Sequence, residues 1–229
     1  MQRKELAMEP KGQAMGPDFL TITSQKNRAI SIKVTCGHFT TINSHTSHYL
    51  EMSEMKFNTV AARGIAQQLA LPYLSDARVD TIVCMDGTEI IAAYMAEELR
   101  RYGTSMIYLD KEIYAVTPMH RGNGQLIFHQ SVQRMIQGKQ ILLLVATVAS
   151  GKTILSAMDC LAYYCGELAG VSAIFSSMPE MNGQGINALF TSDDIPNYRF
   201  YDLADCDLCK AGRRLDAIVN SEGYSKVEC

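Results

Sequence analysis

The sequence predicts an α/β protein with a mostly parallel sheet that carries helices on both faces. Short apolar runs alternate along the chain with stretches whose apolar residues recur at helical spacing. Parallel strands that are joined through helices are buried on both faces, so their sequences read as bare apolar runs. Small or polar residues follow two of these runs, and ligands of such sheets bind at the carboxyl ends of the strands.

The composition is that of an ordinary globular protein, with 47% hydrophobic and 20% charged residues among 229. This length can bury a substantial core. A formal net charge of −3 disfavours broad affinity for nucleic acid or for an anionic membrane. No apolar run approaches the length of a membrane span, and the polar start is unlike a signal peptide. We therefore expect a cytoplasmic protein whose seven cysteines are reduced thiols.

The first half of the chain supplies an irregular start and three predicted elements. Residues 1–30 are polar and irregular, so we expect a loosely held start. Residues 51–71 have apolar side chains at helical spacing, which predicts a helix. An apolar run at residues 79–85 predicts a buried strand. Thr88 can cap a helix that runs to residue 102.

The second half continues the alternation of strands and helices. An apolar run from Ile141 predicts a buried strand, and a helix is expected over residues 152–164. Strands are also predicted at residues 105–109, 113–117, 126–128, 170–175 and 198–203, a loop at 119–124 and a short helix at 132–136.

The segment at residues 140–153 carries the strongest functional signal. Its apolar strand ends in a loop of small residues from which a helix begins, and loop N–H groups together with a helix N-terminus attract an anion. Ser150, Gly151, Lys152 and Thr153 add hydroxyls, close backbone approach and a cation. A lysine at a helix start opposes the helix dipole unless an anion binds there. The pattern predicts a phosphate-binding site.

A nucleoside-triphosphate P-loop is one interpretation of this segment. Gly151, Lys152 and Thr153 fit the end of that motif. The position of its first glycine holds Ala146, however, and the apolar run at residues 171–176 contains no acid that could bind Mg²⁺.

The second interpretation is a resemblance to type I phosphoribosyltransferases, above all the orotate phosphoribosyltransferases. The 140–153 segment is similar to their ribose-phosphate loop. Four other segments also resemble the family, and all five occur along the chain in the family's order and spacing. These are residues 36–39, similar to the base-covering segment; 81–98, similar to the first core strand, pyrophosphate loop and helix; 114–138, where the mobile loop lies; and 206–212, similar to the Cys-x-x-Cys-Lys-x-Gly tail of some members. The resemblance covers about residues 34–225.

The resemblance implies a Rossmann-like sheet with a small hood. Residues 1–50 would contribute to the hood, 51–205 would form the core and 206–229 would be a tail that packs on the hood. It implies a glycosyltransferase of pyrimidine biosynthesis, in which orotate displaces pyrophosphate from phosphoribosyl pyrophosphate with Mg²⁺. It also implies a homodimer in which the mobile loop of one subunit reaches its neighbour's site.

Particular residues take roles through this resemblance. The 5′-phosphate would bind at Ser150, Gly151, Lys152 and Thr153, and the pyrophosphate would meet the backbone of Met85, Asp86, Gly87 and Thr88. The base would be covered by Gly37, His38 and Phe39. The charge of the leaving pyrophosphate would be approached by His120 and Arg121. Simpler roles remain open: Asp86 and Gly87 as a tight turn, His120 and Arg121 as exposed loop residues, and His38 as a buried, hydrogen-bonded histidine.

The chain departs from the family at the end of the Ile141 strand. The family carries two acids there, which hold the ribose hydroxyls, whereas this chain has Ala146 and Thr147. Thr147 can still donate or accept a hydrogen bond, but Ala146 can do neither. We therefore expect phosphate binding without full catalytic power. The alternatives are a weakened transferase and a silent protein that senses phosphoribosyl pyrophosphate or a nucleotide.

Two pairs of residues have the spacing of zinc ligands, His45 with His48 and Cys206 with Cys209. Together they would complete a tetrahedral site, but they lie far apart in the sequence and only one Cys-x-x-Cys is present. No helix clearly begins at Cys206, which disfavours a redox dithiol. We expect Cys206 and Cys209 to pack in the tail, without a bound metal.

Overall fold

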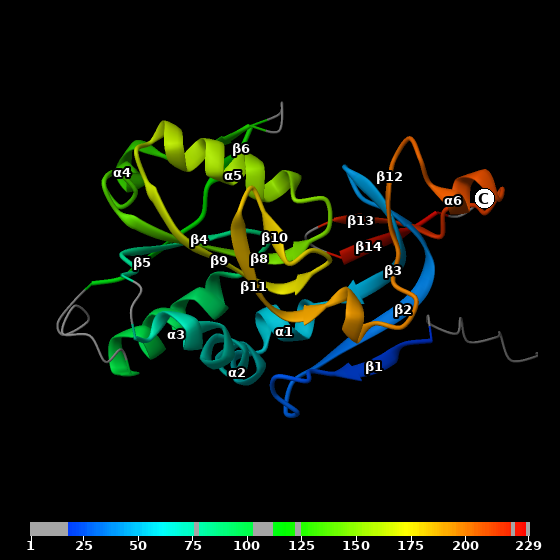
Figure 1. Ribbon diagram of the computed structural model, residues 1–229, viewed down its shortest axis with the longest axis horizontal. Helices are drawn as coiled ribbons and strands as arrows, with labels where there is room; N and C mark the ends of the chain where they lie inside the picture. Colours follow the sequence, from blue (N-terminus) through cyan, green and yellow to red (C-terminus); the bar gives the residue numbers. More distant parts are fainter. Residues whose placement is uncertain (1–17, 76–77, 103–111, 122–124, 221–222, 228–229) are drawn as a thin grey trace, which may run out of the picture.

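The computed structural model describes residues 18–75, 78–102, 112–121, 125–220 and 223–227. Within these residues the chain forms two six-stranded sheets, which lie next to one another (Figure 1). The core sheet has the order β10-β11-β9-β8-β4-β5. The sheet of the hood has the order β12-β3-β2-β13-β14, with β1 paired to β2.

The core sheet is parallel except at one edge. Its parallel strands are β4 (Thr81–Cys84), β5 (Tyr114–Val116), β8 (Gln140–Val148), β9 (Glu167–Ser176) and β11 (Gln184–Thr191). The short strand β10 (Glu180–Met181) pairs antiparallel with β11. The predicted mostly parallel sheet is therefore confirmed. The strand predicted at residues 105–109 lies outside the described residues.

Helices cover both faces of this sheet, as predicted (Figure 1). On one face lie α1 (Ser53–Phe57), α2 (Thr59–Ala70) and α3 (Glu89–Tyr102); on the other lie α4 (Gln130–Gln133), α5 (Lys152–Tyr163) and the hairpin of β6 (Met119–His120) and β7 (Leu126–Ile127). Side chains alternate across β8, so Leu142 and Leu144 pack toward α2 and α3 while Leu143 and Val145 pack toward α5. None of the described helices is long and apolar enough to cross a membrane.

The single helix predicted at residues 51–71 is two helices, with a 3-10 turn at Leu71–Tyr73. Asn58 separates them because its backbone is extended, with φ −80° and ψ 116°. Its side-chain oxygen accepts hydrogen bonds from the Val60 and Ala61 amides at 2.9 and 3.3 Å. These bonds satisfy two of the free donors at the start of α2, so Asn58 acts as a helix cap.

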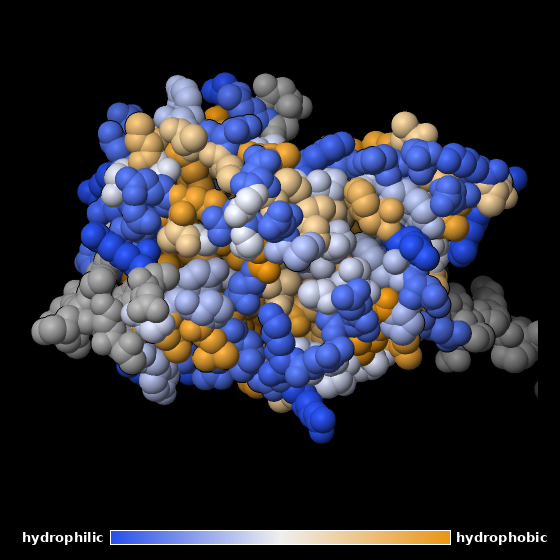
Figure 2. Space-filling model, in the orientation of Figure 1, coloured by the Kyte–Doolittle hydropathy of each residue, from blue (hydrophilic) through white to orange (hydrophobic). Residues whose placement is uncertain are grey.

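The hood is assembled from three distant parts of the chain. Its strands are β1 (Leu20–Thr23), β2 (Ser31–Thr40), β3 (Ser44–Glu51), β12 (Phe200–Asp202), β13 (Ala217–Asn220) and β14 (Gly223–Lys226). The strand predicted at residues 198–203 thus belongs to the hood, where β12 pairs with β3. Phe39, Tyr49 and Ala217 form a small buried cluster under this sheet. Hydrophilic residues dominate the outer end of the hood, around the short helix α6 (Asp207–Lys210) (Figure 2).

Candidate functional site

A cavity of about 1090 Å³ lies between the core and the hood. The core contributes Asp86, which follows β4, and residues 146–156, which span the end of β8 and the start of α5. The hood contributes residues 41–44, between β2 and β3, and part of the β13–β14 pair. Since β4 and β8 are neighbouring parallel strands, their carboxyl ends and following loops open into the same space.

The loop between β8 and α5 forms one wall of this cavity. Ser150, Gly151, Lys152 and Thr153 all line it, so the four predicted phosphate-binding residues lie together. Gly151 precedes α5 in the left-handed conformation, with φ +72°, which favours glycine. The 12-residue helix α5 therefore begins at the cavity, and its first amides have no acceptor within the helix. This arrangement provides amide donors, hydroxyls and an exposed ammonium group for an anion.

The loop after β4 has a second strained turn. Asp86 and Gly87 both have positive φ angles, +59° and +79°. The hydroxyl of Thr88 donates to the carbonyl oxygens of Met85 and Leu144 at 2.9 and 3.2 Å, which fastens the loop to β8. Of the four residues predicted to meet pyrophosphate, Asp86 lines the cavity, whereas the side chains of Met85 and Thr88 are buried behind it.

Lys56 is a cavity residue that the sequence interpretation missed. It lies in α1 and is 5% exposed, and its ammonium group donates a 3.0 Å hydrogen bond to the carbonyl oxygen of Asp86. Burial lowers the pKa of Lys56, although the charges of Asp86, Glu51 and Glu89 oppose the shift. A lysine between Met55 and Phe57 was the available signal, because an ammonium group that is buried beside apolar side chains needs polar partners.

Asp86 is the counterpart of Lys56 in the same corner. Burial raises the pKa of the Asp86 carboxyl, and the nearby charges of Lys56 and His120 act against this increase. His120 lines the cavity. Arg121 lines a neighbouring smaller cavity instead. The Arg121 amide donates to the carbonyl oxygen of Gln125 at 2.8 Å; residues 122–124 lie outside the described part of the chain.

Ala146 and Thr147 lie at the end of β8 and line the cavity. The Ala146 side chain is 4% exposed and packs toward the helices α1 to α3. The Thr147 hydroxyl lies 3.4 Å from the sulfur of Met52, to which it donates. Among the described residues that line the cavity, carboxylates are found at Asp86 and Asp159. Where the resembled family has its two acids, this chain therefore presents the methyl group of Ala146 and the hydroxyl of Thr147.

The residues predicted to cover the base lie elsewhere in the hood. Gly37, His38 and Phe39 belong to β2 and do not line the cavity. A Cβ atom at Gly37 would lie 2.5 Å from the ring of Phe39, which packs into the small hood cluster with Tyr49. Residues 41–44, which follow a few positions later, are among the hood residues that do line the cavity.

The cysteines of the tail have a different environment from the one expected. Cys206 and Cys209 lie against His38 and His45, whereas His48 contacts Cys36, with 3.1 Å between the histidine Nε2 and the sulfur. The two cysteines were expected to pack within the tail, but β2 and β3 bring two histidines against them. A short helix, α6, also begins directly after Cys206.

No protein-family profile matches this sequence. No curated protein sequence matches it either. Solved structures do: UMP synthase of Leishmania donovani has a TM-score of 0.51 and 14% identity, over 70% of this chain and 34% of that one. This chain thus spans about a third of the UMP synthase chain. The orotate phosphoribosyltransferase of Mycobacterium tuberculosis H37Rv, solved with Fe(III) dicitrate, has a TM-score of 0.50 and 14% identity, over 72% of this chain and 93% of that one. With the sheet order and the two loops described above, these likenesses show that the chain has the type I phosphoribosyltransferase fold.

Proposed function

We propose that this protein binds phosphoribosyl pyrophosphate in the cavity between the core and the hood and transfers its phosphoribosyl group slowly to an orotate-like base. The observation that carries the proposal is the meeting of two loops at one cavity. The loop after β8 brings the start of α5 and Lys152, and the loop after β4 brings Asp86 beside Lys56. Two anion-attracting corners at neighbouring strands suit a ligand with two separate phosphate groups.

The two corners would divide the ligand between them. Residues 150–153 would hold the 5′-phosphate at the start of α5, and the strained turn at Asp86 and Gly87 would face the pyrophosphate, with Lys56 and His120 as cations. The base would then lie toward residues 41–44 of the hood. Closure of the hood side over the ligand would exclude water and strengthen these contacts.

Mg²⁺ would enter with the pyrophosphate and neutralise part of its charge. Mg²⁺ takes oxygen ligands and keeps several waters, so it needs few protein groups. Asp86 is a carboxylate at the pyrophosphate corner and can supply such an oxygen. In this proposal the chain's own contribution is the position of Asp86 and the positive charge of Lys56 beside it.

Slow transfer follows from the side chains at the end of β8. A transferase of this kind builds positive charge on the ribose in its transition state, and carboxylates are the groups that stabilise such charge. Ala146 and Thr147 cannot supply a negative charge. The same observation favours a second candidate function, a silent protein that binds phosphoribosyl pyrophosphate or a nucleotide without turnover.

A thermal-shift panel with a turnover assay tests the proposal. The panel contains phosphoribosyl pyrophosphate, orotate, orotidine monophosphate, purine nucleotides and ATP, each with and without Mg²⁺. We expect phosphoribosyl pyrophosphate and orotidine monophosphate to raise the melting temperature. Formation of orotidine monophosphate at a low rate supports the weak transferase, and binding without any product supports the silent protein. Stabilisation by ATP alone would instead favour the P-loop interpretation.

We also propose that the protein is a homodimer. The hairpin of β6 and β7 carries His120 at the cavity edge, at the place where the resembled family reaches into the neighbouring subunit. Two-fold pairs are the commonest soluble oligomers. Light scattering at high micromolar concentration should give twice the monomer mass, and a stable monomer would refute the proposal.

A further inference from the structure

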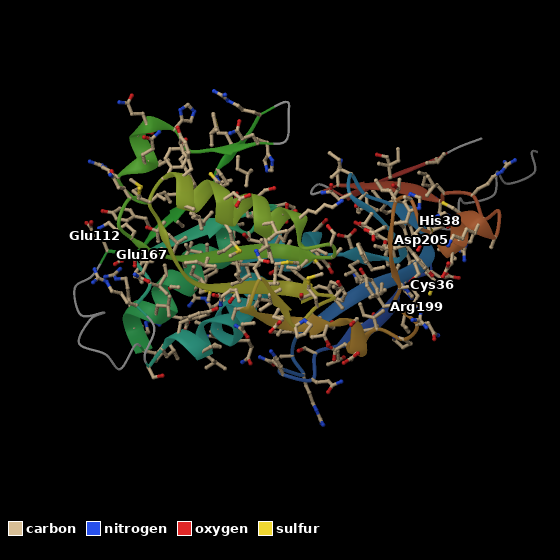
Figure 3. All side chains as sticks on the ribbon, turned by 45° about the horizontal axis from the view of Figure 1, so that its top comes forward. Cys36, His38, Glu112, Glu167, Arg199 and Asp205 are labelled. Atoms are coloured by element: carbon tan, nitrogen blue, oxygen red, sulfur yellow. The ribbon has the colours of Figure 1, made fainter. Side chains whose placement is uncertain are left out.

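Four side chains that bind metals well converge at the outer end of the hood. His38 of β2, His45 of β3 and the tail residues Cys206 and Cys209 each offer one ligand atom, and these atoms all lie within 4.8 Å of one another. Figure 3 shows His38 beside the segment of Asp205, at the opposite end of the molecule from Glu112 and Glu167. This cluster is separate from the cavity between the core and the hood, since none of its four residues lines that cavity.

The spacing of the four atoms suits a tetrahedral metal ion. The Nε2 of His38 and the Nδ1 of His45 are 3.1 Å apart. The sulfur of Cys209 lies 3.3 Å from the His45 nitrogen and 3.7 Å from the His38 nitrogen, and the sulfur of Cys206 lies 3.5 Å from the latter. Zinc bonds of about 2.0–2.3 Å place neighbouring ligand atoms roughly 3.3–3.8 Å apart in a tetrahedron. The two remaining pairs of ligand atoms also lie within 4.8 Å, so shifts of at most about one ångström would bring all four atoms to these distances.

Contacts outside the cluster orient its ligands. The Nδ1 of His38 lies 2.9 Å from the carbonyl oxygen of Arg213, so a proton on this nitrogen leaves Nε2 free to bind a metal. The His38 amide donates to the Asp216 carboxylate at 2.6 Å. The register of β2 against β3 shifts between Cys36 and Phe39, and this bulge contains His38.

The cysteines lie on a tight turn of the kind that holds two thiolates on one ion. The Lys210 amide donates to the carbonyl oxygen of Cys206 at 3.0 Å, and the Gly212 amide donates to that of Cys209 at 2.9 Å. Gly212 then leaves the turn with φ +72°, a conformation that favours glycine. Both cysteines are free of disulfides, and Cys206 is 2% exposed.

We propose that His38, His45, Cys206 and Cys209 bind one Zn²⁺ ion per chain as a closed structural site. Two thiolates and two imidazoles in a tetrahedron are a ligand set that selects zinc, and four protein ligands leave no position for substrate. The two thiols release their protons to solvent when the metal binds. This proposal reverses the sequence-based expectation of no metal and does not depend on the transferase proposal.

The site would fasten the tail to the hood. Cys206 and Cys209 precede β13, which pairs in parallel with β2 next to Phe39. The β13–β14 pair in turn lines the phosphate cavity through Val219, Asn220 and Gly223. A metal that joins the tail to β2 and β3 would therefore hold the far wall of the cavity in place.

Metal analysis of the purified full chain, prepared without chelator, tests the site. We expect about one zinc per chain. The variants Cys206→Ser and His45→Ala should lose most of it. Their matched controls are Cys36→Ser and His48→Ala, which alter a cysteine–histidine pair in the same two strands but outside the cluster, and they should keep it. Wild-type protein without zinc, even after incubation with ZnCl₂, would overturn the proposal.

Cobalt replacement keeps the test valid if the cysteine variants fail to fold. Wild-type protein that is refilled with Co²⁺ should show the intense visible absorption of a tetrahedral thiolate site. Hydrogen exchange should then show slower exchange for residues 206–220 with the metal than after chelation. A weak octahedral cobalt spectrum, or exchange that does not respond to the metal, would contradict a structural zinc site.

Discussion

The core is built on parallel strands, namely β4, β5, β8, β9 and β11. Its central strand β8 buries apolar side chains on both faces of the sheet. In the hood, three distant parts of the chain make a sheet whose own buried cluster contains Phe39, Tyr49 and Ala217. The hood instead concentrates polar side chains, including three of the histidines. Apolar burial stabilises the core and also the part of β2 that adds Ile32 and Val34 to the larger apolar cluster, whereas the outer end of the hood depends on particular polar contacts.

This difference matters because the cavity needs both parts. The core fixes the loop at residues 150–153 and the turn at Asp86, while the hood supplies the opposite wall. A change in the core should act on global stability or on phosphate binding. A change in the hood should act on how that wall is held. The following predictions test this division, beginning with the largest expected effect.

The largest expected effect is the loss of a core phenylalanine. Phe190 in β11 is fully buried in the larger apolar cluster, so Phe190→Ala should lower the free energy of unfolding by about 3–5 kcal/mol. Phe39→Ala in the hood removes the same atoms from a much smaller cluster and should cost less. Urea unfolding followed by circular dichroism measures both. Equal losses would show that the hood is stabilised in the same way as the core.

The second prediction concerns the end of β8. The double variant Ala146→Glu, Thr147→Asp restores two acids and should raise the transfer rate, with little change in affinity, because only contacts that strengthen in the transition state increase turnover. One such contact is worth about 2.7–4 kcal/mol in comparable sites, which sets the upper limit. Ala146 is 4% exposed, so some stability should be lost as well.

The matched control for this variant is Ala146→Gln, Thr147→Asn, which has the same size without the charges. It should share the loss of stability but show no gain in rate. An equal gain in both variants would show that packing, rather than charge, limits the reaction. Wild-type turnover near the enzyme median of about 10 s⁻¹ would show that acids are dispensable here.

The third prediction concerns Lys152 at the start of α5. Lys152→Ala should weaken the binding of a 5′-phosphorylated ligand by about 1.5–3 kcal/mol, the energy of a hydrogen bond to a charged group. Calorimetry measures the affinity. Lys139→Ala is the control, since Lys139 precedes the opposite end of β8 and does not line the cavity. Unchanged affinity in Lys152→Ala would show that the phosphate does not bind at this loop.

The fourth and smallest effect is a pH dependence from Lys56. Burial lowers the pKa of Lys56 in the folded protein, so between that pKa and the ordinary value of 10.5 the unfolded chain binds more protons. Stability contributed by this group should therefore rise with pH across that window, and Lys56→Met should flatten the rise.

Anion binding should follow the opposite trend, because it needs the charged form of Lys56. Affinity for phosphoribosyl pyrophosphate should fall as the pH increases toward the pKa of Lys56. Lys56→Arg keeps its charge throughout and should lose less affinity over the same range. Calorimetric titrations at several alkaline pH values compare the two proteins. If affinity changed with pH in the same way in wild type and in Lys56→Arg, Lys56 would not belong to the binding site.

The sequence predicted those features that depend on neighbouring residues. The alternation of β8 and α5, the loop at residues 150–153 and the missing acids at Ala146 and Thr147 all lie in one continuous segment. Lys56 was missed because its environment is set by the turn at Asp86, 30 residues away along the chain.

The hood could not be predicted in the same way. Its strands β2 and β3 are rich in threonine, serine and histidine, so they lack the apolar runs that mark the core strands. His38 meets Cys206 only because β2 pairs with β3 and the tail returns across 168 positions. The spacing typical of zinc ligands suggested His45 together with His48, which lie on one strand. The cluster instead takes its two histidines, His38 and His45, from adjacent strands.

Titration calorimetry with phosphoribosyl pyrophosphate and Mg²⁺ tests the central claim most directly, that the two loops at the cavity form one site for a ribose with two phosphate groups. The account predicts saturable binding of one molecule per chain, which orotidine monophosphate displaces and which weakens in Lys152→Ala. The absence of binding, or binding that orotidine monophosphate leaves unchanged while ATP competes, would contradict it.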